Sequence, residues 1–104
     1  MGIDVALVNE NHEAQQEVYD PQQCLTSLAL GTWQEMKGSI CLRFIDAFGD
    51  TVFNKFQVPV LLSELEKSAA SQTDPKIKSH LIKVCRLVSV AQNKGHMYIK
   101  FIGD

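Results

Sequence analysis

The spacing of apolar residues changes twice along the chain, and this change most constrains the fold. Near both ends, in residues 1–8 and 97–102, apolar side chains recur at every second position. Between residues 58 and 91 they recur at every third or fourth position. The first spacing is typical of a strand with one buried face, and the second of a helix with one buried face. The chain therefore combines terminal strands with long amphipathic helices.

Capping residues mark where the helices begin. Asp20 is a favourable N-cap, Pro21 suits the first helical position, and Gly31 ends this first helix. Pro59 begins a second helix, and Asp74 with Pro75 begins a third. Three charged residues make up the predicted outward face of the second helix: Glu64, Glu66 and Lys67. The short connection 71–73 predicts that the second and third helices form an antiparallel hairpin.

The remaining segments predict further strands. Residues 9–13 form a polar turn, after which residues 16–19 return as a hairpin strand. Residues 38–45 are apolar on both faces, which favours an inner strand in which Arg43 needs a partner. Residues 51–56 are either another strand or the approach to the second helix. We therefore expect a single α+β domain over residues 1–104, with a small mixed or antiparallel sheet of about four to five strands packed against three helices.

The composition, with 45% hydrophobic and 21% charged residues, is that of an ordinary globular protein. The longest apolar run is shorter than the roughly 20 residues that cross a bilayer, and the residues after Met1 lack the basic start of a secretory signal. Cys24, Cys41 and Cys85 are odd in number and widely spaced, which predicts buried, reduced thiols. We expect a cytoplasmic protein that binds no membrane.

Asp46 and Asp50 are the first candidates for chemistry. They flank Phe48 and Gly49 at the end of the predicted inner strand, and carboxylate oxygens are suitable ligands for Mg²⁺ or Ca²⁺. The alternative is structural: Asp46 forms an Asx turn, Gly49 adopts a positive φ, and Asp50 bonds local amides. We favour the turn, because the segment lacks the further acids of a calcium loop.

Other chemistry-bearing residues are scattered. His12, His80 and His96 lie in different predicted elements and share no metal-ligand spacing, which favours three independent surface histidines. The cysteines have no electropositive setting that would favour a thiolate. Four basic residues share the third helix: Lys76, Lys78, Lys83 and Arg86. Because the pI is about 5.9 and no aromatic residues interleave with them, we expect no nucleic acid partner. We predict no catalytic residue, metal ligand or cofactor.

Charge is distributed unevenly between the two ends. Residues 1–36 contain six acidic residues and no Lys or Arg, whereas residues 75–103 contain six basic residues and no acidic one. The two ends either neutralise each other in the fold or attract a charged partner. The second alternative predicts an acidic binding surface for a basic partner, formed by Glu10, Glu13, Glu17 and Asp20.

Several segments resemble a family of small bacterial proteins without an assigned activity. The matching pieces are MGIDVALV, YDPQQ, LRFIDAFGDTVFN, LLSELE and YIKFIGD, which together span most of the chain. Small cytosolic proteins of this kind are frequently immunity proteins, which bind and neutralise the toxin domain of a contact-dependent or polymorphic toxin system. The resemblance thus implies a stoichiometric inhibitor of a toxin, for example a basic nuclease. A metal-dependent enzyme using Asp46 and Asp50, or a regulatory partner-binding domain, is the alternative, and the oligomeric state stays open.

Overall fold

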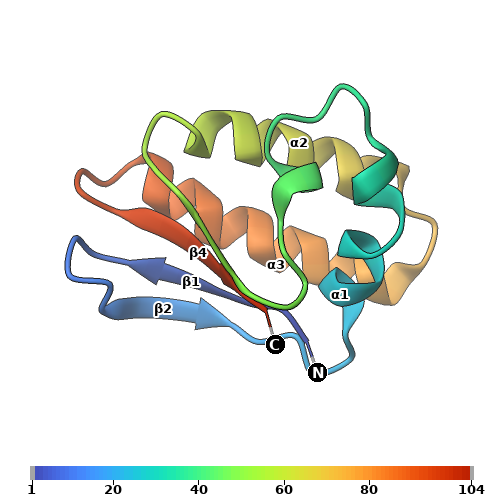
Figure 1. The fold of residues 1–104 in the computed structure, drawn as a ribbon, viewed down its shortest axis with the longest axis horizontal. Helices are drawn as coiled ribbons and strands as arrows, with labels where there is room; N and C mark the ends of the chain where they lie inside the picture. Colours follow the sequence, from blue (N-terminus) through green and yellow to red (C-terminus); the bar gives the residue numbers. More distant parts are fainter. Residues whose placement is uncertain (1, 104) are drawn as a thin grey trace.

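An antiparallel sheet of four strands forms one layer of the molecule (Figure 1). Its strands are β1 (Asp4–Val8), β2 (Ala14–Val18), β3 (Asp50–Phe53) and β4 (Tyr98–Ile102), in the order β2-β1-β4-β3. The computed structural model describes residues 2–103, so Met1 of the predicted first strand and Asp104 of the terminal motif lie outside the described residues. The two ends of the chain meet at the centre of the sheet, where β1 and β4 pair along their full lengths.

One face of the sheet packs against the core, and the other face is open only in part, because Ala6 and Val8 of β1 are buried there. On the buried face, Val5 and Leu7 of β1 lie opposite Phe101 and Ile99 of β4, and all four side chains are fully buried. Phe53 of β3 packs edge-on against Phe101, with 5.8 Å between the ring centroids. The alternation predicted for the two ends is confirmed in β4, where every second residue enters the core. In β1, by contrast, all four residues from Val5 to Val8 are buried, so the prediction of a single buried face was wrong there.

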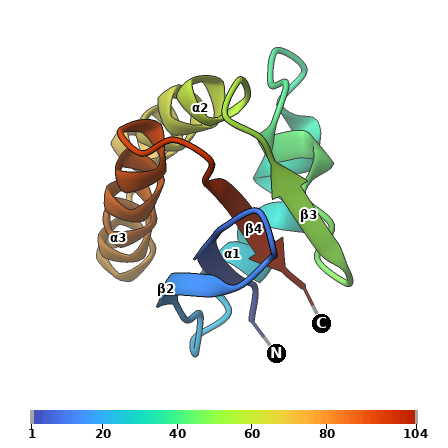
Figure 2. The same ribbon diagram turned by 90° about the vertical axis from the view of Figure 1, so that its left-hand side faces the viewer.

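The helices α2 (Val58–Ser71) and α3 (Pro75–Gln92) pack against each other on the buried side of the sheet (Figure 2). Their apolar faces are buried in the same core as the strands, with Leu61 and Leu65 on α2 and Leu81 and Val84 on α3 all at 0% exposure. Asp74 caps α3 as predicted, because its side chain accepts a hydrogen bond from the amide of Lys76. The predicted α+β architecture with a C-terminal pair of helices is confirmed.

The first helix begins later than its capping signal predicts. Helix α1 (Cys24–Ala29) has Gln23 as its N-cap, in a left-handed conformation with φ of 57°. Asp20 nevertheless satisfies the start of the helix, because its carboxylate accepts hydrogen bonds from the amides of Cys24 and Leu25. The prediction that Asp20 is the N-cap and Pro21 the first helical residue was wrong, because α1 begins at Cys24. The prediction that the Asp20 carboxylate accepts hydrogen bonds from amides at the start of this helix was right.

Residues 38–45 do not form the predicted inner strand. They form an irregular segment that contains the 3₁₀ turn η2 (Leu42–Phe44), which follows α1 and the turn η1 (Thr32–Glu35). Glu64 of α2 holds this segment: its carboxylate accepts hydrogen bonds from the amides of Ile40, Cys41 and Leu42. Glu64 is only 9% exposed, so its predicted place on the outward face of α2 was also wrong. Arg43 is exposed and stacks over Phe44, with 4.8 Å from the guanidinium to the ring.

Residues 46–53 form a turn followed by β3, which is one of the two edge strands of the sheet. The amide of Phe48 bonds Asp46 Oδ1 at 2.8 Å, as expected of an Asx turn, but Gly49 does not adopt the predicted positive φ. Gly103, which directly follows β4, packs against this turn, and its amide donates to the carbonyl of Gly49 at 2.8 Å. A Cβ at Gly103 would come within 2.6 Å of the carbonyls of Asp46 and Gly49, so the contact requires glycine.

Candidate functional site

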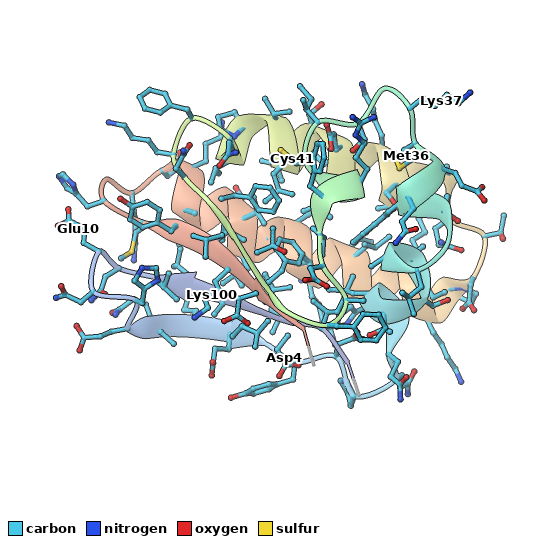
Figure 3. All side chains as sticks on the ribbon, in the orientation of Figure 1. Asp4, Glu10, Met36, Lys37, Cys41 and Lys100 are labelled. Atoms are coloured by element: carbon cyan, nitrogen blue, oxygen red, sulfur yellow. The ribbon has the colours of Figure 1, made fainter. Side chains whose placement is uncertain are left out.

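Three of the four predicted partner-binding acids lie together on the hairpin formed by β1 and β2. Glu10 and Glu13 are in its turn, Glu17 is on β2, and all three are exposed. Figure 3 shows Glu10 at the end of the molecule where this hairpin turns. The fourth, Asp20, is 2% exposed and is therefore not part of that surface.

The hairpin orients its carboxylates. Asn9 Oδ1 accepts hydrogen bonds from the amides of Asn11 and Glu13, and Asn9 Nδ2 donates to Glu13 Oε1 at 3.1 Å. The hydroxyl of Tyr19 donates to Glu17 Oε2 at 2.7 Å, a bond that raises the pKa of Tyr19. Glu10 Oε1 lies 2.6 Å from Nδ1 of His96, which is on the turn before β4. These contacts limit the rotamers of the acids before any partner arrives.

The face of the sheet opposite the helices extends the acidic surface. The pairing of the strands puts Glu17, Ala6 and Lys100 in one row across this face. Asp4, Ile102 and Asp50 form the next row. Lys100 Nζ lies 3.5 Å from Asp50 Oδ2, and Figure 3 shows Lys100 over the sheet. Acidic side chains outnumber basic ones in these rows, so the open face continues the charge of the hairpin.

Asp20 joins the N-terminal strand to α1. Its Oδ2 accepts hydrogen bonds from the amides of Ile3 and Leu25, and its Oδ1 accepts one from Cys24 at 2.7 Å. The chain approaches so closely here that a Cβ at Gly2 would overlap the carbonyl of Asp20. A buried carboxylate with three amide donors is well satisfied, so Asp20 has a structural role.

His80 on α3 faces this carboxylate, which corrects its predicted position on the surface. Its Nε2 lies 3.7 Å from Asp20 Oδ1, is buried, and has no hydrogen-bond partner among the described residues. Burial lowers the pKa of His80, while the charge of Asp20 acts in the opposite direction. The imidazole is therefore neutral at pH 7 and fills the space between α3 and the start of α1.

A cleft of about 690 Å³ lies beside this pair, between the end of β2 and the first turns of α3. Its rim has charges of both signs, with Glu17 on the strand side and Lys76 and Lys83 on the helix side. Cys24 also lines the cleft, but burial and the charge of Asp20 raise the pKa of its thiol. A protonated thiol is a poor nucleophile, so Cys24 is not arranged for covalent catalysis.

The other candidates for chemistry are separate from one another. Asp46 is engaged in its turn and Asp50 pairs with Lys100, so the two carboxylates do not share a site. Within residues 2–103, no three His, Cys, Asp or Glu side chains are close enough together to hold a metal ion. His12 and His96 lie in turns with φ near 60°, at 61° and 60°.

The remaining cysteines and the lysines of α3 also lack a shared site. All three cysteines are free; Cys24 and Cys41 are buried, as predicted, and Cys85 is partly buried. Burial raises the pKa of both Cys41 and Cys85 to about 11. Lys76, Lys78 and Lys83 are exposed on α3. Among residues 2–103, no helix is both long and apolar enough to cross a membrane.

Comparisons of the chain with models of protein families, with curated proteins and with solved structures gave no match.

Proposed function

We propose that the chain is a cytoplasmic immunity protein, which binds and neutralises a basic bacterial toxin domain by stoichiometric contact. The exposed acidic hairpin carries this proposal. Glu10, Glu13 and Glu17 are exposed, and residues 1–36, which include the whole hairpin, contain no Lys or Arg. The resemblance of the LRFIDAFGDTVFN and YIKFIGD segments to small bacterial proteins directs the proposal towards toxins rather than towards other basic partners.

The arrangement of the hairpin supports inhibition by contact. A toxin that acts on nucleic acid carries basic residues where it binds the phosphate backbone. An acidic surface attracts such a domain during diffusional encounter and competes for the same basic residues once bound. Tyr19 is 62% exposed beside Glu17, and it supplies an amphipathic aromatic side chain of the kind that is enriched in protein interfaces. The open sheet face with Asp4 and Asp50 widens the area that a partner can cover.

The test is a titration of the purified chain with the protein encoded by the adjacent reading frame, which the proposal requires to contain a toxin domain. We expect a complex with one copy of each protein. The double variant Glu13→Lys, Glu17→Lys should associate more slowly, on the order of tenfold at low salt, because it reverses the charge that attracts the partner. The difference should shrink at high salt, where surface charges are screened.

The matched control is Glu35→Lys, Glu66→Lys. Both glutamates are exposed and lie away from the hairpin, on η1 and α2, so this variant has the same net charge as the first. It should bind as the wild type does. Equal losses in the two variants would show that only net charge matters and would remove the hairpin from the proposal. Absence of binding by the wild type would contradict the immunity function itself.

A further inference from the structure

Phe56 stands out among the exposed apolar residues. Its side chain is 78% exposed, the largest value among the exposed large apolar residues of the described chain. It lies in the turn between β3 and α2, which is held by side-chain bonds. Asn54 Oδ1 accepts from the amides of Phe56 and Gln57, and Gln57 Oε1 accepts from the amide of Asn54. A large apolar side chain fixed in an exposed position is typical of a binding surface.

Phe56 lines three clefts, and in each of them further apolar residues lie among polar ones. The cleft on the sheet side, about 200 Å³, contains Met97 and Tyr98. The second, about 350 Å³, contains Pro59 and Ala91 between the two long helices. The third, about 230 Å³, contains Ile40 and Val60. Ile40 is itself 65% exposed, so two large apolar side chains border the same cleft.

The charged side chains that line the three clefts are basic. No Asp or Glu lines any of the three clefts, whereas Lys55 and Lys94 both do. The ammonium group of Lys55 lies over the Phe56 ring, 5.1 Å from its centroid. Neither lysine forms an ion pair within the part of the chain that the structure describes.

We propose that this Phe56 surface, formed by Ile40, Lys55, Phe56, Lys94 and Met97, binds an acidic, apolar segment of another protein. Phe56 and Ile40 provide the buried contact area, and the two lysines select carboxylates on the segment and repel basic ones. The turns at residues 9–13, 54–57 and 93–97 gather at one end of the molecule (Figures 1 and 2). The Phe56 surface thus lies near the acidic hairpin, but it selects an acidic partner segment, whereas the hairpin selects a basic one. It adds a second binding surface to the proposed function, on which this inference rests.

The test uses two synthetic peptides, one alternating Asp with Phe and Leu, and one in which every Asp is replaced by Lys. Isotope-labelled protein is titrated with each, and amide chemical shifts are recorded. The acidic peptide should shift the signals of residues 54–57 and 93–97, and the basic peptide should not. Shifts located elsewhere, equal binding of both peptides, or no shifts at millimolar peptide would each overturn the proposal.

Variants separate the apolar and the charged contributions. Phe56→Ala should weaken binding of the acidic peptide at least tenfold, while Phe48→Ala, which removes a comparably exposed ring elsewhere, should leave it unchanged. Lys55→Glu, Lys94→Glu should reverse the preference between the two peptides. Glu13→Lys, Glu17→Lys should retain binding of the acidic peptide, so failure of the Phe56 surface and failure of the acidic hairpin are distinguishable. Equal weakening by Phe56→Ala and Phe48→Ala would contradict the site.

Discussion

At the scale of single residues, Glu64 shows how a buried charge organises an irregular segment. Its two carboxylate oxygens accept hydrogen bonds from three consecutive amides, those of residues 40–42, and from the hydroxyl of Ser39 at 2.9 Å. Burial by itself would raise the pKa of Glu64, but these hydrogen bonds outweigh it and lower the pKa below its ordinary value of 4.5. The ionised side chain therefore accepts the hydrogen bonds that the carbonyl groups of a neighbouring strand would otherwise accept from these amides.

We predict that Glu64→Gln destabilises the fold by about 2 kcal/mol at pH 7, because one acceptor oxygen is replaced by a donor that faces backbone amides. Since the folded pKa of Glu64 is lowered, its contribution is present above about pH 4.5 and is lost as the pH falls through the folded value. The difference between wild type and variant should therefore shrink in acid. Urea unfolding at several pH values measures it, with Glu66→Gln on the exposed face of α2 as the control. A difference that stays constant with pH would contradict this role.

His80 contributes a second pH dependence with a different window. Its folded pKa is lowered from 6.5, mainly by burial, so the unfolded chain binds a proton more readily than the folded chain does. Stability should fall as the pH drops from 6.5 towards the folded pKa. We predict that His80→Leu removes this part of the pH dependence, which urea unfolding between about pH 7 and pH 5 can measure. An unchanged slope in the variant would contradict the burial of a neutral imidazole.

At the scale of elements, segments with a clear alternation were predictable and segments held by distant partners were not. Strand β4 and the long helices follow from their own spacing, because each buries one regular face. Strand β1 is found where it was predicted, but Ala6 and Val8 on its other face are buried as well. Residues 38–45 have the alternation of a strand, yet their amides bond Glu64, more than twenty residues away in the chain. Local spacing cannot reveal such a partner.

The structural role of Asp46 in a turn was predicted from the sequence, but the positive φ predicted for Gly49 was not found.

Asp20 accepts hydrogen bonds from amides at the start of α1, as Glu64 does from the amides of residues 40–42. We predict that Asp20→Ala costs about 3 kcal/mol, because the amides of Ile3, Cys24 and Leu25 all lose their acceptor in a buried site. Hydrogen exchange should show that protection is lost first in α1. Asp74→Ala, which removes an exposed cap with one hydrogen bond, should cost only about 1 kcal/mol. Equal costs for the two variants would show that Asp20 does not hold the start of α1.

At the scale of the whole molecule, the fold separates charges that the sequence concentrates at the two ends of the chain. Pairing of β1 with β4 brings the acidic and basic ends together, yet within residues 2–103 no Lys or Arg of the basic end forms an ion pair with an acid of the acidic end. The close contacts between the two ends are those of His80 with Asp20 and of His96 with Glu10. Glu13 and Glu17 stay exposed on the hairpin, and Lys55 and Lys94 lie at the Phe56 surface. The uneven charge was visible in the sequence, whereas the burial of Asp20 and the exposure of Phe56 depend on long-range packing.

Growth of cells that produce the protein encoded by the adjacent reading frame, the toxin that the proposal requires, tests the central proposal most directly. Co-expression of the wild-type chain should restore growth, because the inhibitor occupies the basic surface that the toxin needs. Glu13→Lys, Glu17→Lys should fail to restore it when both proteins are present at the same level, and the charge-matched Glu35→Lys, Glu66→Lys should succeed. If cells with the wild-type chain die as readily as cells without it, the proposed immunity function is wrong.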